Sequence, residues 1–79
     1  MCAGRRFNAS LNIEAIAVRP ADASKVFEAL SSAVRLEAFR LLVRHEPAGL
    51  VAGEIAAELG VSPANLSFHL KTLTHAGLV

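Results

Sequence analysis

The chain has 79 residues, 53% of them hydrophobic, and a formal net charge of +1. This length permits one small domain, and this hydrophobic content is too high for an intrinsically disordered chain. The only aromatic residues are four phenylalanines, and the predominance of Leu and Ala favours small packed helices over a β-sandwich.

Charge and cysteine content exclude further classes. Because the net charge is close to zero, any binding of nucleic acid must rest on a local surface. A single cysteine, Cys2, allows neither an internal disulfide nor a thiolate cluster within one chain, which is typical of a reducing, cytoplasmic setting. No segment approaches the ~20 consecutive apolar residues of a membrane span, so we expect no membrane association.

Residues 1–20 are expected to form a poorly ordered N-terminal tail ahead of a domain over residues 21–79. Leu11, Ile13 and Ala15 alternate with polar residues, which is a weak strand signal. A lone strand has no evident partner here, and Pro20 ends the segment.

The first two helices are predicted over about 22–30 and 33–44, with Asp22 and Ser32 as their N-caps. Hydrophobic residues at helical spacing predict the buried faces: Val26, Phe27 and Leu30 in the first helix, and Leu36, Phe39 and Val43, with Leu42 beside them, in the second. The solvent side of the second helix is expected to carry Arg35, Glu37, Arg40 and Arg44. The segment Pro47-Ala48-Gly49 ends that helix.

The last two helices are predicted over about 51–59 and 63–76. Ala52, Ile55, Ala56 and Leu59 form the buried face of the third helix, and Leu66, Leu70 and Leu73 that of the fourth. Gly60 suits a left-handed position after the third helix. Ser62 is a good N-cap for the fourth, and Pro63 fits its first turn.

These last two helices are joined by the three-residue turn Gly60-Val61-Ser62, with the small Ala56 one turn before the glycine. A short turn that begins with Gly and a small residue at the crossing are typical of a helix-turn-helix, whose second helix enters the major groove of DNA. An ordinary corner between two helices in a small bundle has the same local pattern.

The wider sequence resembles the ArsR/SmtB family of winged helix-turn-helix repressors, from about residue 25 to residue 79. The resemblance is carried by Leu30-Ser31-Ser32-Ala33-Val34-Arg35-Leu36, Phe39-Arg40-Leu41-Leu42, Gly53-Glu54-Ile55-Ala56 and Leu59-Gly60-Val61-Ser62. Its most specific part is Leu66-Ser67-Phe68-His69-Leu70-Lys71-Thr72-Leu73 followed by Ala76-Gly77-Leu78-Val79.

The resemblance implies a sequence-specific repressor of double-stranded DNA that inserts the helix over 63–76 into the major groove. In this family a β-hairpin wing and a C-terminal helix follow the Ala-Gly-Leu-Val segment, so the expected fold is an all-α helix-turn-helix core without wing or last helix. The family dimerises mainly through its first and last helices. Without the last helix, we do not expect a stable homodimer.

Successive residues of a helix lie about 100° apart, which turns Ala64, Phe68, Lys71 and His75 away from the buried leucines. Helix N-termini suit phosphates and approach DNA first. The predicted DNA-binding residues are Ser62, Ala64, Asn65, Ser67, Phe68, His69 and Lys71. Asn65 can pair with adenine, and Lys71 is either a phosphate ligand or a solvated lysine. Ser62 is either a helix cap alone or a helix cap that also contacts a DNA phosphate.

Two of these residues have alternative interpretations. Phe68 packs either on a thymine methyl group or beneath the missing wing. His69 lies at the margin of the buried face, where the family often has a histidine that resembles a DNA contact, and an interior histidine is an equal alternative.

We expect no metal site, no cofactor and no catalysis. The family's Cys-x-Cys sensing positions correspond to Val51 and Gly53, which cannot bind metal, and His45, His69 and His75 are not spaced to share an ion. No constellation of catalytic residues is present. The alternative function is a truncated interaction module that dimerises with full-length repressors through its first helix without binding DNA.

Overall fold

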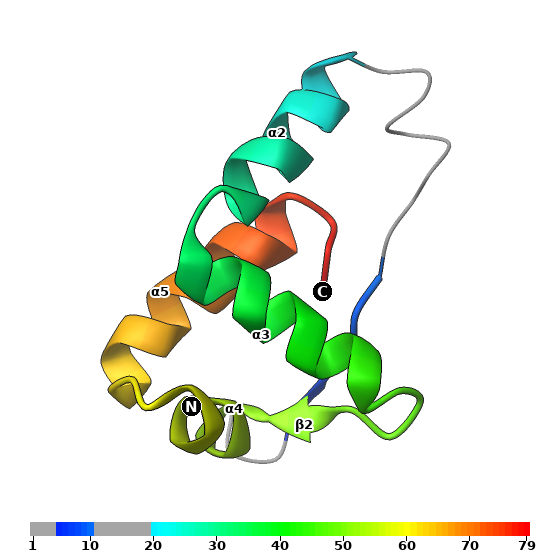
Figure 1. Ribbon diagram of the computed structural model, residues 1–79. Helices are drawn as coiled ribbons and strands as arrows, with labels where there is room; N and C mark the ends of the chain where they lie inside the picture. The colour runs from blue at the N-terminus through cyan, green and yellow to red at the C-terminus, as the bar shows by residue number, and fades with distance from the viewer. Residues whose placement is uncertain (1–4, 11–19) are drawn as a thin grey trace.

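The computed structural model describes residues 5–10 and 20–79 (Figure 1). In chain order, the elements of this part are β1 (Arg6–Phe7), α2 (Pro20–Leu30), α3 (Ala33–Arg44), β2 (Leu50–Val51), α4 (Ala52–Leu59) and α5 (Pro63–His75). The predicted helical core is confirmed, with a two-stranded sheet added to it. None of the helices described has the length and hydrophobicity needed to cross a membrane.

The helix boundaries follow local capping signals. Ser32 is the N-cap of α3, and its side chain accepts a hydrogen bond from the backbone N–H of Arg35. Helix α2 begins at Pro20, two residues before the predicted start. Proline suits the first helical turn because its φ is already helical and its N–H is not needed. Asp22 consequently lies within α2 and not at its N-cap. The weak strand pattern at Leu11, Ile13 and Ala15 lies outside the described residues.

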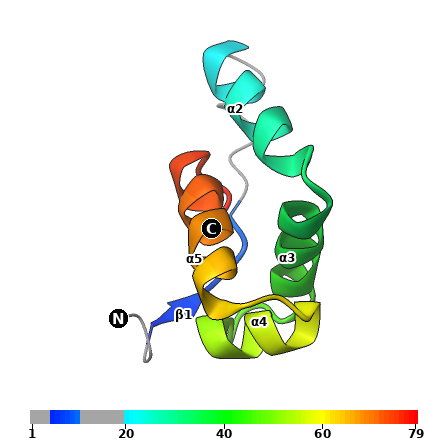
Figure 2. The same cartoon turned by 90° about the vertical axis from the view of Figure 1, so that its left-hand side faces the viewer.

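Helices α3 and α5 lie side by side, and α4 crosses beneath both of them (Figure 2). Helix α2 packs on α3 and α5 from the other end. The side chains that fill this arrangement completely are Leu42, Ile55, Leu66, Leu73 and Leu78. One small hydrophobic core therefore holds α5 in position along its whole length.

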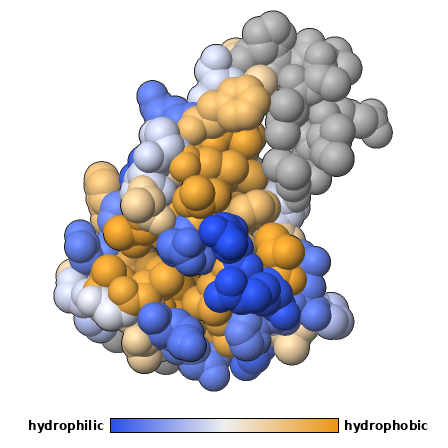
Figure 3. Space-filling model, in the orientation of Figure 1, coloured by the Kyte–Doolittle hydropathy of each residue, from blue (hydrophilic) through white to orange (hydrophobic). Residues whose placement is uncertain are grey.

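The predicted buried faces of α2 and α3 are wrong in part. Phe27, Leu36 and Val43 are exposed, and α3 instead buries Ala38, Leu41 and Leu42. Two overlapping hydrophobic stripes run along α3, and the stripe with the small Ala38 allows the neighbouring helices to approach most closely. Hydrophobic side chains accordingly gather on the surface along α2 and towards its junction with α3 (Figure 3).

Strand β1, near the N-terminus, pairs with β2, which nothing in the sequence pattern indicates. Strands β1 and β2 are antiparallel, with Arg6 opposite Val51 and Phe7 opposite Leu50. Phe7 is buried in the core. Gly49, at φ 73°, permits this pairing, because a Cβ there would lie 2.5 Å from the carbonyl oxygen of Phe7. Part of the expected tail is thus packed against the domain.

Candidate nucleic-acid interface

The corner between α4 and α5 has the predicted three-residue turn. Gly60 adopts the left-handed conformation at φ 68° and ψ 33°, and its N–H donates to the carbonyl oxygen of Ala56. The N–H of Val61 donates to the same oxygen over 3.1 Å. A non-glycine residue at this φ is strained, so Gly60 ends α4 and redirects the chain.

Helix α5 starts directly after this turn, with the predicted cap. The hydroxyl oxygen of Ser62 accepts a hydrogen bond from the backbone N–H of Asn65 over 3.2 Å. Pro63 follows in the first turn. The N-terminal end of α5 is therefore well defined, and its partial positive charge faces solvent.

The orientation of α5 is also as predicted. Leu66, Leu70 and Leu73 are buried. Six of the predicted DNA-binding residues are exposed: Ser62, Ala64, Asn65, Ser67, Phe68 and Lys71. The N-terminal half of α5 thus exposes polar side chains and one aromatic ring next to the turn.

Comparison with known families decides what this corner is. Residues 30–79 match the family model described as a helix-turn-helix domain. The chain belongs to the helix-turn-helix domain family. No curated protein matches the sequence. Since helix-turn-helix domains bind DNA, the family indicates a DNA-binding regulator.

The seventh predicted residue, His69, occupies a different environment from the other six. It is half-buried, and its Nδ1 accepts a hydrogen bond from Nη1 of Arg35 over 3.3 Å. Because a guanidinium only donates, this geometry leaves the proton of a neutral imidazole on Nε2. Its ring also meets the edge of Phe68 at 6.1 Å between centroids. His69 thus joins α5 to α3.

Arg35 was expected on the solvent side of α3, but it is half-buried and bound. Its Nε donates to the carbonyl oxygen of Ala29 over 2.7 Å. With the bond to His69, this side chain ties the end of α2 to α3 and α5. Nothing in the helical period predicts such contacts, because the partners lie on other elements.

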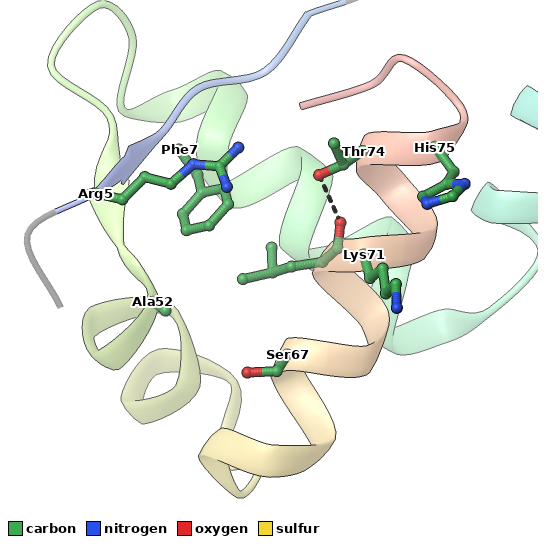
Figure 4. A pocket seen from close by; sticks show the side chains of 8 residues that line it. Arg5, Phe7, Ala52, Ser67, Lys71, Thr74 and His75 are labelled. Atoms are coloured by element: carbon green, nitrogen blue, oxygen red, sulfur yellow. Dashed lines mark hydrogen bonds between the residues drawn. The ribbon is translucent and has the colours of Figure 1, made fainter. Parts of the chain in front are cut away.

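Sequence reasoning also missed Arg5. A pocket of about 250 Å³ lies beside the helix-turn-helix, with Arg5 and Phe7 on one side and Ser67, Lys71, Thr74 and His75 of α5 on the other (Figure 4). These α5 residues share one stripe of the helix. Arg5 belongs to a segment without periodicity, so no local pattern could have placed it there.

The described residues contain no group of three histidines, cysteines or carboxylates that could hold a metal ion. Val51 and Gly53 lie at the start of α4, where neither side chain offers a ligand. Glu54 is engaged in capping this helix, because its Oε1 accepts from the N–H of Val51 over 3.0 Å.

Proposed function

We propose that this chain is a sequence-specific transcriptional repressor of the ArsR/SmtB type, which inserts α5 into the major groove of duplex DNA. The observation that carries the proposal is the exposed N-terminal half of α5 beyond a capped three-residue turn. The major groove is about 12 Å wide and admits one helix. An α5 whose opposite face is anchored by Leu66, Leu70 and Leu73 can enter it without unfolding.

The residues of α5 divide by the chemistry they offer. Asn65 has an amide that can form a bidentate pair with adenine. Lys71 and the hydroxyl of Ser67 suit phosphate oxygens. Ser62 and Ala64 lie at the N-terminal end of α5, which would approach the sugar-phosphate backbone of the DNA. Phe68 suits a thymine methyl group. His69 can donate from Nε2 while its Nδ1 remains bound to Arg35.

The proposal is tested by selecting duplexes from a randomised pool with the whole chain and measuring binding by fluorescence anisotropy at several salt concentrations. We expect affinity that falls with salt. Asn65→Ala should cost about 1–3 kcal/mol and relax the preference at one base pair. Lys71→Ala should weaken binding to all sequences alike. It should also make the slope of log affinity against log salt concentration less steep by about 1.

Arg40→Ala is the matched control for Lys71→Ala. Arg40 lies opposite the buried face of α3 and pairs with Glu37 over 3.4 Å, so its loss changes net charge equally without touching α5. A chain that shows no salt-dependent binding to any duplex would refute the proposal. If Lys71→Ala and Arg40→Ala changed DNA affinity and its salt dependence equally, the role of Lys71 would be refuted.

The exposed hydrophobic surface favours a second candidate, an interaction module that associates with other repressor subunits through α2. Phe27 is 66% exposed, and Leu36 is exposed nearby in sequence at the start of α3. Sedimentation analysis of the wild type and of Phe27→Ala separates the two functions. Self-association that depends on Phe27, in a chain without affinity for DNA, would support the interaction module.

A further inference from the structure

The pocket beside α5 has the chemistry of an anion site. Arg5 lines one side of it and the hydroxyl of Ser67 the side formed by α5, where it can donate a hydrogen bond, while the Lys71 side chain, also at the pocket, points away from Arg5 (Figure 4). Among the described residues that line it, none carries a carboxylate. An anion in the pocket therefore meets the guanidinium of Arg5, and a polyanion that extends along α5 meets Lys71 as well.

Arg5 is held at this position by three features of its neighbours. Its guanidinium lies 4.7 Å from the ring centroid of Phe7, in a cation–π contact. Phe7 is buried and pairs with Leu50. The next side chain, Arg6, donates to the carbonyl oxygens of Ala48 and Gly49 over 2.8 and 2.9 Å. Because the backbone at Arg5 is anchored, its side chain loses less freedom on binding a ligand than a tail residue would.

The pocket adjoins the exposed face of the recognition helix. Lys71 belongs both to the pocket and to the outward row that Ala64 and Phe68 begin. A polyanion lying along that row reaches the pocket without any change in the fold. Phosphates that flank a recognition helix position the protein on the duplex.

We propose that Arg5 is a DNA-binding residue, which contacts the phosphodiester backbone together with Lys71 when α5 enters the groove. The segment over residues 5–7 is then a second DNA-binding element, held beside α5 by its pairing with β2. This inference rests on the proposed DNA-binding function.

The experiment compares wild type, Arg5→Gln, Arg5→Lys and the control Arg40→Gln on a duplex selected with the wild type and on a random duplex. Log affinity is measured against log salt concentration by fluorescence anisotropy. For Arg5→Gln we expect a slope less steep by about 1 and a similar loss of affinity on both duplexes, because one phosphate contact is lost. Arg5→Lys should retain the wild-type slope, and Arg40→Gln should leave the slope unchanged.

The outcomes separate this inference from the proposed function. If the wild type shows no salt-dependent binding, the proposed function fails. In another outcome, the wild type binds while Arg5→Gln either shows the same salt slope as the wild type or loses no more DNA affinity than Arg40→Gln does. In either case only the inference about Arg5 fails. Thermal unfolding of each variant shows whether the fold is retained. If Arg5→Gln is less stable, a wild-type salt slope in Arg5→Lys still supports the phosphate contact.

Inorganic phosphate is the second probe. If the pocket served a free anion, phosphate at constant ionic strength would raise the Tm of the wild type but not that of Arg5→Gln. That result would overturn the assignment to the DNA backbone. Equal Tm values with and without phosphate are expected, because a single phosphate lacks the contacts that α5 makes with the rest of a duplex.

Discussion

Nη1 of Arg35 donates to Nδ1 of His69 over 3.3 Å and joins α3 to α5. The same guanidinium binds the carbonyl oxygen of Ala29 through its Nε, so one side chain contacts the end of α2 as well. The position of α5 relative to α2 and α3 thus depends on a polar contact as well as on the hydrophobic core.

Replacement of Arg35 by Lys should destabilise the fold, although the charge is conserved. Lysine cannot reproduce the planar fork that reaches Ala29 and His69 together. Loss of charge-assisted hydrogen bonds of this kind costs about 1.5–3 kcal/mol, which urea denaturation can measure. Arg40→Lys is the control, because Arg40 is exposed and pairs only with the nearby Glu37 among the contacts described. Equal stability of the two variants would contradict the role given to Arg35.

Substitution by alanine should change the stability of the chain in opposite directions at two glycines, which lie at opposite ends of α4. A Cβ at Gly60 or at Gly53 meets no atom within 4 Å, so only backbone conformation distinguishes them. Gly60→Ala should cost about 1–2 kcal/mol because φ is positive there. Gly53→Ala should stabilise the chain by roughly 0.4–1 kcal/mol, since Gly53 is helical. Urea denaturation of both variants provides the check, and a Gly60→Ala chain of wild-type stability would mean that the turn is misassigned.

Ser62 has a capping role and a proposed phosphate role, and Asp at this position separates them. Aspartate caps helices as well as serine does and interacts favourably with the helix dipole. Ser62→Asp should therefore keep the wild-type Tm but weaken DNA binding, because its charge repels phosphate. Ser62→Ala should lose about 0.5–2 kcal/mol of stability. Undiminished DNA affinity of Ser62→Asp would show that this residue lies away from the backbone.

Phe68 and Phe27 form a matched pair, because they are 65% and 66% exposed on different helices. Alanine at either position should change stability by no more than about 0.5 kcal/mol, as is usual at the surface. Only Phe68→Ala should reduce DNA affinity, with the largest effect on duplexes that place a thymine beside it. Anisotropy titrations of both variants measure this difference. If Phe27→Ala lowers DNA affinity equally, the effect does not arise from contact with α5.

Much of the corner could be predicted from sequence because its determinants are local. The cap at Ser62, the left-handed Gly60 and the leucines of α5 each involve a few consecutive residues. The buried face of α3 could not be predicted in the same way. Its two hydrophobic stripes are both compatible with the helical period. Which of them is buried depends on which one lets α4 and α5 approach closely.

The sequence by itself determined the four helices, the turn between α4 and α5, and the exposed side of α5. Tertiary structure alone decided the bond between Arg35 and His69, the pairing of Arg6–Phe7 with Leu50–Val51, and the position of Arg5 at a pocket beside α5. The reason is physical: backbone dihedrals, caps and periodicity act between near neighbours in the chain, whereas these contacts join residues that meet only after the helices have packed together.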